Sequence, residues 1–256
     1  MTHPILDQPS VLQVLFHPRR DNSIPPNGVY PVAVEVEPGV TVGGRLYPAA
    51  AQNPAILYFH GNGEIAADYD RFAQYYTQLG ITLLVIDYRG YGVSNGTPTA
   101  SNLLTDAITV FNAVGSILES HGLSPKQVYV MGRSLGSAAA IEVALHAKEK
   151  LAGLIIESGF AQTFPLLARL GVEVRGADEE RDGAGNARKI SQITTRTLII
   201  HGQEDFLIPV AQALILHRGC AAQDKQLVLI PNAGHNDLMM FGRSQYFDAI
   251  QKFVGS

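Results

Sequence analysis

One segment near the middle of the chain constrains the fold more than any other. An apolar run at residues 127–131 leads directly into a Gly-x-Ser-x-Gly sequence at residues 132–136, and three alanines follow at residues 138–140. A strand that turns this sharply into a helix forces the central Ser134 into a strained backbone conformation, and side chains two residues to either side would collide. Because glycines occupy those two positions, the segment predicts a tight strand–serine–helix turn.

The chain around this turn alternates between short apolar runs and helical patterns. Continuously apolar runs are typical of strands that are buried on both faces of a parallel sheet, and parallel strands need helices between them. The pattern predicts strands at residues 55–59, 81–86, 127–131, 154–156, 197–200 and 226–230, and helices at residues 69–79, 101–121 and 135–148. An antiparallel hairpin is predicted before them, at residues 32–47. We therefore predict an α/β protein with a mostly parallel sheet and helices on both faces.

Length and composition fit a single domain covering residues 1–256. Of these residues 46% are hydrophobic and 16% are charged, as in a protein that buries a large core. Residues 159–195 connect two predicted strands at unusual length, and we interpret them as a short lid or cap insertion. The formal net charge of -4 leaves no basic stripe, which excludes a nucleic-acid-binding class.

The sequence gives no sign of a cofactor, a metal site or a membrane segment. Cys220 is the only cysteine, so an internal disulfide or a thiolate metal cluster is excluded. His60 and His201 each end a predicted strand before a glycine but have no further ligand at metal-binding spacing, so we expect structural hydrogen bonds there. No apolar run reaches the roughly 18 residues of a spanning helix, and the first residues do not resemble a secretory signal. We expect a cytoplasmic protein.

Two further residues are candidates for work with Ser134. A serine hydroxyl is a poor nucleophile at neutral pH, so it needs a base to take its proton and an acid to orient that base. Asp205 and His235 each follow a predicted strand, in the order Ser, Asp, His. Glu204 is the adjacent alternative to Asp205, but the position directly before Phe206 favours Asp205. We predict Ser134 as nucleophile, His235 as base and Asp205 as acid.

Backbone amides near the serine are candidates for an oxyanion hole. The first donor is expected at Leu135, directly after the nucleophile, and the second in the glycine-containing loop at residues 60–64. We place the second donor at Asn62, with Gly63 as the alternative. A phosphate-binding loop is the competing interpretation, but the loop lacks the Gly-Lys-Ser/Thr sequence that such a site needs.

Four apolar side chains near the expected mouth of the site are candidates for an acyl pocket. They are Phe160, Phe164, Phe206 and Met239. Each of them alone is equally well explained as an ordinary core residue. If they form the pocket, we expect short to medium acyl chains to be preferred.

Taken together, the motifs resemble the α/β-hydrolase superfamily, and within it the Bem46-like and ABHD-type branch of serine hydrolases. The segments that carry the resemblance are residues 60–64, 87–96, 132–137 and 234–238, and it extends from Val32 to the end of the chain. It implies an α/β-hydrolase fold with an eight-stranded type of sheet, and cleavage of an ester or thioester bond in a small-molecule substrate through an acyl-enzyme intermediate. Carboxylesterase, lysophospholipase and thioesterase activities all fit this expectation.

Other functions use the same residues or the same fold. A peptidase or an acyltransferase would share the triad, and a non-catalytic binding protein could keep the fold without turnover. The sequence predicts neither the acyl group nor the oligomeric state.

Overall fold

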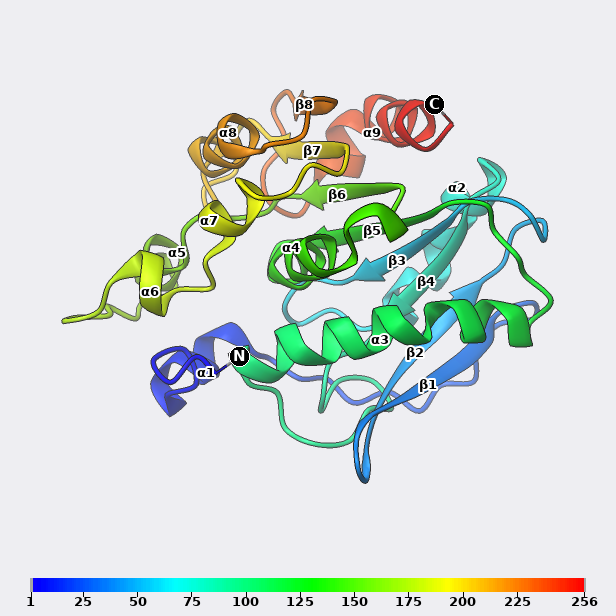
Figure 1. The fold of residues 1–256 in the computed structure, drawn as a ribbon, viewed down its shortest axis with the longest axis horizontal. Coiled ribbons are helices and arrows are strands. Elements are labelled where there is room, and N and C mark those ends of the chain that lie inside the picture. The colour runs from blue at the N-terminus through cyan, green and yellow to red at the C-terminus, as the bar shows by residue number, and fades with distance from the viewer. Residues whose placement is uncertain (1, 256) are drawn as a thin grey trace.

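The predicted strands join one eight-stranded sheet in the computed structural model, which describes residues 2–255 (Figure 1). The strand order is β1-β2-β4-β3-β5-β6-β7-β8. The first two neighbouring pairs, β1 with β2 and β2 with β4, are antiparallel, and the other five pairs are parallel. The strands are β1 Tyr30–Glu37, β2 Val40–Tyr47, β3 Ala55–Phe59, β4 Thr82–Ile86, β5 Val128–Arg133, β6 Gly153–Glu157, β7 Thr197–Gly202 and β8 Lys225–Ile230. The predicted α/β-hydrolase fold, with its N-terminal hairpin and mostly parallel sheet, is therefore confirmed.

Helices cover both faces of the sheet (Figure 1). The helical elements are α1 Pro9–Leu15, η1 Ala66–Arg71, α2 Ala73–Gln78, α3 Ala100–Ser120, α4 Gly136–Ala147, η2 Lys148–Lys150, α5 Thr163–Arg169, α6 Glu179–Asp182, α7 Asn186–Ile190, α8 Val210–Gly219 and α9 Leu238–Val254. Alternate residues of one strand point into two separate cores: Leu57 and Phe59 of β3 pack on the side of α3 and α4, whereas Ile56 and Tyr58 pack on the side of α2 and α9. The two-sided burial explains why these strands are apolar along their whole length.

In the N-terminal half, the structure contains one helix that is not predicted and an earlier start for another. The segment before the hairpin, which shows no clear strand or helix pattern, contains α1 with Pro9 at its first position, where proline is well tolerated. The helix predicted from residue 69 begins earlier, as η1, and breaks before α2. The earlier start follows from side-chain capping, because Asp68 accepts the backbone N–H of Ile65 and Asp87 accepts that of Ala66.

The insertion at residues 159–195 is folded and packs on the rest of the molecule. It contains α5, α6 and α7, and both carboxylate oxygens of Glu179 accept backbone N–H groups at the start of α5, from Thr163 and Phe164, each at 2.7 Å. Helix α7 packs against α4 and α8, and α5 packs against α1, so the N-terminal helix and the insertion meet at one end of the molecule (Figure 1). The role of the insertion as a lid stays a prediction.

Within residues 2–255, none of the helices combines the length and the apolar character that a bilayer span requires.

Candidate active site

Ser134 occupies the tight turn between β5 and α4 that the sequence predicts. Its φ is 51°, in the left-handed region that non-glycine residues rarely adopt. The strained backbone is held from both sides: the Ser134 N–H donates to the carbonyl of Glu157 at 2.9 Å, and the Ser137 hydroxyl donates to the Ser134 carbonyl at 2.6 Å. A strained backbone conformation persists only where surrounding contacts hold it, and here these two hydrogen bonds hold Ser134 at the end of a central strand.

The glycines on either side of Ser134 are required by close packing. A Cβ on Gly132 would lie 2.7 Å from the Cβ of Ala140, and it would overlap the Gly136 carbonyl. A Cβ on Gly136 would overlap the Phe59 carbonyl at the end of β3. The absence of both side chains therefore lets α4 begin directly against the sheet.

We expect a Gly136→Ala substitution to lower the free energy of unfolding by about 3 kcal/mol, because the new methyl group meets rigid backbone. Gly115→Ala is the matched control. Gly115 is exposed within α3 and a Cβ there meets nothing within 4 Å, so the same change should stabilise the protein by about 1 kcal/mol through helix propensity. Urea unfolding of both variants measures the difference. A neutral Gly136→Ala would contradict the packing argument.

Ser134, His235 and Asp205 form one continuous chain of hydrogen bonds. His235 Nδ1 lies 2.7 Å from Asp205 Oδ2, and His235 Nε2 lies 2.9 Å from Ser134 Oγ. Because a carboxylate only accepts hydrogen bonds, Nδ1 carries the imidazole proton, and Nε2 is left to accept the serine hydroxyl proton. The three side chains come from the carboxyl ends of β5, β7 and β8, at one edge of the sheet.

Asp205 is fixed by its own turn. Its Oδ1 accepts the backbone N–H groups of Leu207 and Ile208 at 3.0 and 2.7 Å, and the side chain is buried. The neighbouring Glu204 is exposed, and its backbone N–H bonds to the carbonyl of Ala233. Of the two candidate acids, Asp205 is the one that contacts the histidine.

The two other histidines near the site are buried hydrogen-bonding residues. His201 Nε2 lies 2.7 Å from the carbonyl of Ile208, and His60 Nδ1 lies 2.8 Å from the carbonyl of Gly61. Burial lowers the pKa of His201, which favours its neutral form. In the described residues 2–255, no group of three or more His, Cys, Asp and Glu side chains is arranged to hold a metal ion.

The loop after β3 directs the side chain of Asn62 away from Ser134. Asn62 Oδ1 accepts the N–H of His17 and the hydroxyl of Tyr91, both at 2.8 Å, and Asn62 Nδ2 donates to the carbonyl of Val14 at 3.4 Å. With the side chain bound in this way, the Asn62 backbone N–H is left over. Neither it nor the Leu135 N–H donates to a protein acceptor anywhere in residues 2–255. These are the two amides that the sequence singles out.

The alternative donor, Gly63, lies beside the Tyr91 hydroxyl. The backbone N–H of His17 donates to the Tyr91 hydroxyl at 2.7 Å. Burial raises the pKa of the Tyr91 phenol, and the nearby backbone N–H groups of His17 and Gly63 oppose that rise. The carbonyl of Gly63 accepts Arg19 Nη1 at 3.0 Å, and Arg19 also pairs with Asp68 at 2.7 Å. The N-terminal segment therefore holds this loop, a contact between residues more than 40 positions apart that no local pattern in the sequence signals.

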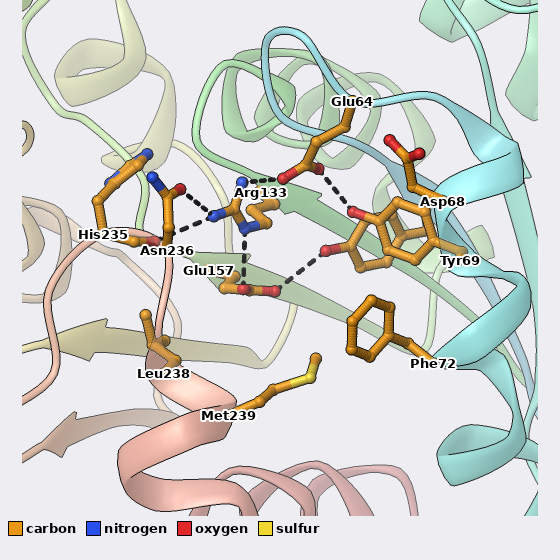
Figure 2. A pocket seen from close by; sticks show the side chains of 11 residues that line it. Glu64, Asp68, Tyr69, Phe72, Arg133, Glu157, His235, Asn236, Leu238 and Met239 are labelled. Atoms are coloured by element: carbon orange, nitrogen blue, oxygen red, sulfur yellow. Dashed lines mark hydrogen bonds and ion pairs between the residues drawn. The ribbon is translucent and has the colours of Figure 1, made fainter.

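Arg133 is the variable residue directly before the serine, and the Gly-x-Ser-x-Gly motif gives no sign of a role for it. Its buried guanidinium bonds to Glu64, to Glu157 at 3.2 Å, and to the His235 carbonyl and Asn236 Oδ1 at 3.0 and 2.8 Å (Figure 2). Burial alone would lower the pKa of Arg133, but the carboxylates of Glu64 and Glu157 raise it overall, so the group stays charged.

Two cavities lie beside the triad, on opposite faces of the sheet. The larger, of about 310 Å³, is bordered by η1, by Phe72 between η1 and α2, and by the start of α9 (Figure 2). It is lined by Tyr58, Glu64, Asp68, Tyr69, Phe72, Arg133, Glu157, His235, Asn236, Leu238 and Met239. The smaller, of about 20 Å³, lies on the α4 side and is lined by Leu6, Leu15, Phe16, Ala100, Leu103, Leu104, Leu135, Ala138, Phe160, Thr163 and Ala184.

The four side chains predicted for one acyl pocket do not come together. Phe160 lines the smaller cavity and Met239 the larger one, and these belong to the two different cores. Phe164 is partly buried against the core and Phe206 is 82% exposed, and neither lines either cavity. The structure therefore does not bring the four side chains into one pocket, because nearness to the triad in the sequence does not determine which face of the sheet a side chain reaches.

The sequence of this chain matches a known family and several of its members. The family model described as serine aminopeptidase, S33, matches residues 50–177. The α/β-hydrolase domain-containing protein 17B of Xenopus laevis is 32% identical over 218 residues, which are 82% of this chain and 68% of that protein. The human protein 17B is 32% identical over 207 residues, 78% of this chain, and this chain spans 65% of the human protein's length.

Solved structures share the fold at low sequence identity. The esterase Pf2001 of Pyrococcus furiosus superposes with a TM-score of 0.76 at 17% identity, covering 94% of this chain and 98% of that one. A soluble variant of the monoglyceride lipase of Saccharomyces cerevisiae gives 0.68 at 16% identity, covering 91% and 95%. With the family match and the relatives above, the chain belongs to the α/β-hydrolase superfamily, in the S33 family and its Bem46-like branch of α/β-hydrolase domain-containing 17 proteins.

Proposed function

We propose that this protein hydrolyses a carboxylic ester or thioester of a small molecule through a covalent acyl-enzyme on Ser134. The observation that carries the proposal is the hydrogen-bonded chain Asp205–His235–Ser134, with distances of 2.7 and 2.9 Å. Groups spaced in this way can move a proton from the serine to the imidazole as the serine attacks. Membership in an α/β serine hydrolase family supports the same reaction class.

Each proton transfer in the proposed reaction has an assigned donor and acceptor. Ser134 Oγ attacks the acyl carbon while its proton moves to His235 Nε2, and Asp205 stabilises the imidazolium. The oxyanion accepts hydrogen bonds from the free backbone N–H groups of Leu135 and Asn62, and the positive end of the α4 helix dipole stabilises its negative charge. The intermediate collapses as His235 protonates the leaving alkoxide or thiolate. Water then attacks the acyl carbon through the same base, which restores the serine hydroxyl and releases the acid.

The experiment that tests the proposal is reaction of the protein with a fluorophosphonate probe. Only a serine that is activated by a neighbouring base reacts rapidly with such a phosphorus centre. Peptide mass spectrometry should place one phosphonyl group on Ser134. A protein that is folded but not labelled would instead be a non-catalytic member of the family.

The smaller cavity supports a preference for short acyl chains. Leu135 forms part of its wall, the lining residues other than Thr163 are apolar, and at about 20 Å³ it has room for only a few carbon atoms. Phe160 and Phe16 form part of its wall. The cavity holds the acyl part of the substrate, which esters and thioesters of the same acid share, so both are proposed substrates.

A series of nitrophenyl esters of increasing chain length checks this preference. We expect kcat/KM to be highest for short chains, and Phe160→Leu to raise the ratio of octanoate to butyrate hydrolysis by about tenfold, because the smaller side chain lengthens the cavity. Phe164→Leu is the matched control, since Phe164 does not line the cavity and its replacement should leave the ratio unchanged. Equal ratios in the wild type and both variants would place the acyl chain elsewhere.

A further inference from the structure

The guanidinium of Arg133 connects three parts of the site that the sequence separates widely. It bonds to Glu64 in the loop that carries Asn62, to Glu157 at the end of β6, and to the carbonyl of His235 (Figure 2). We propose that Arg133 is a positioning residue, which fixes the histidine loop and the oxyanion loop at the spacing that catalysis by Ser134 requires. The inference rests on the proposed function.

The connection to the oxyanion loop runs through Glu64. One carboxylate oxygen of Glu64 receives Arg133, and the other accepts the Gly61 N–H and the Tyr69 hydroxyl, each at 2.8 Å. Gly61 directly precedes Asn62, and a Cβ on Gly61 would lie 2.6 Å from Arg133 Nη1. The loop therefore rests directly against the guanidinium, and the orientation of the Asn62 amide depends on it.

The connection to the nucleophile runs through β6. Glu157 holds Arg133 with its side chain and also accepts the Tyr58 and Tyr246 hydroxyls, at 3.0 and 2.7 Å. Its backbone carbonyl accepts the N–H of Ser134 at 2.9 Å. The same residue thus anchors the strained serine and the guanidinium beside it.

The third connection is to the histidine loop. Arg133 Nη2 donates to the His235 carbonyl at 3.0 Å and to Asn236 Oδ1 at 2.8 Å. A planar guanidinium can bond in three directions at once, whereas a lysine ammonium cannot hold this geometry. A buried ion pair is by itself weak evidence for a role in stability, so contacts to all three catalytic segments point to positioning.

The larger cavity makes the inference testable by chemical rescue. Arg133, Glu64 and Glu157 lie on its wall, and the exposed Phe72 also lines it, beside Tyr69 (Figure 2). Removal of the Arg133 side chain leaves two carboxylates facing this cavity. A small guanidinium ion can enter and pair with them, because the space of about 310 Å³ exceeds its size.

The experiment compares Arg133→Ala with the wild type on a nitrophenyl ester, with and without methylguanidinium chloride. We expect kcat to fall about 100-fold with KM changed less than about threefold, because a displacement of about 1 Å has an effect of that size. Methylguanidinium should raise the kcat of the Arg133→Ala variant about tenfold, whereas sodium chloride at equal concentration should not raise it. Arg133→Lys should stay at least about tenfold below the wild type.

Arg89→Ala is the matched control for loss of a buried arginine. Arg89 pairs with Asp106 and Glu37, away from the three segments that Arg133 contacts. The kcat of the Arg89→Ala variant should therefore stay near the wild-type value, and methylguanidinium should not change it. If Arg133→Ala does not fold, Arg133→Gln takes its place and should show the same loss of kcat with unchanged KM. An Arg133 variant with wild-type kcat, or a folded Arg133→Ala variant without rescue, would overturn the inference. A wild-type protein without hydrolase activity would instead overturn the proposed function.

Discussion

Ser134→Ala should lower kcat for ester hydrolysis by about a million-fold, the largest effect expected of any single substitution in this chain. The methyl group cannot form the acyl-enzyme, and what remains is the modest acceleration from the oxyanion amides and substrate binding. The substitution removes only one oxygen from a side chain whose backbone is fixed by the Glu157 and Ser137 contacts, so the fold should persist. Single-turnover kinetics with a nitrophenyl ester measure the loss.

Covalent labelling separates loss of the nucleophile from loss of folding. The Ser134→Ala protein should show a wild-type circular dichroism spectrum and urea midpoint while losing all fluorophosphonate labelling. Ser116→Ala, at an exposed position in α3, should keep both activity and labelling. Hydrolysis at more than about a thousandth of the wild-type rate in the Ser134→Ala variant would refute the assignment of the nucleophile.

Asp205→Asn should lower kcat by about ten-thousand-fold, the second largest effect. An asparagine Oδ1 can still accept the N–H groups of Leu207 and Ile208, so the turn should keep its shape. Its amide NH₂, however, would donate to His235 Nδ1 and leave the imidazole proton on Nε2. In that tautomer Nε2 cannot accept the Ser134 proton.

Glu204→Gln is the control that separates the two adjacent carboxylates. Glu204 is exposed, and only its backbone is hydrogen-bonded. The kcat of the Glu204→Gln variant should therefore stay within about twofold of the wild-type value. Measurement of kcat for both variants under identical conditions decides the assignment. The reverse order of effects would assign the role of acid to Glu204.

The strands and the serine turn could be predicted from the sequence because their signals are local. Strands buried on both faces must be apolar along their length, and the turn at Ser134 leaves room only for glycine at residues 132 and 136. The order of Ser134, Asp205 and His235 could be used because parallel strands end at the same edge of the sheet. These constraints act within a few residues or through strand direction alone.

The supports of the site depend on contacts that strand direction does not determine. The hold of His17 and Arg19 on the loop of Asn62 joins segments that no sequence spacing relates. Likewise, the four bonds of Arg133 join segments that follow β3, β6 and β8 to the end of β5, and a variable position inside a motif gives no sign of them.

The sequence by itself determined the fold class, the strained position of Ser134 and the chain order of its candidate partners, because each depends on local sterics or on strand direction. Only the tertiary structure decided that Phe160 and Met239 face different cavities. Alternate residues of a strand, and the helices that connect the strands, lie on opposite faces of the sheet. The tertiary structure also decided which amides are left free and which charged groups meet behind the serine, because these follow from packing between distant segments.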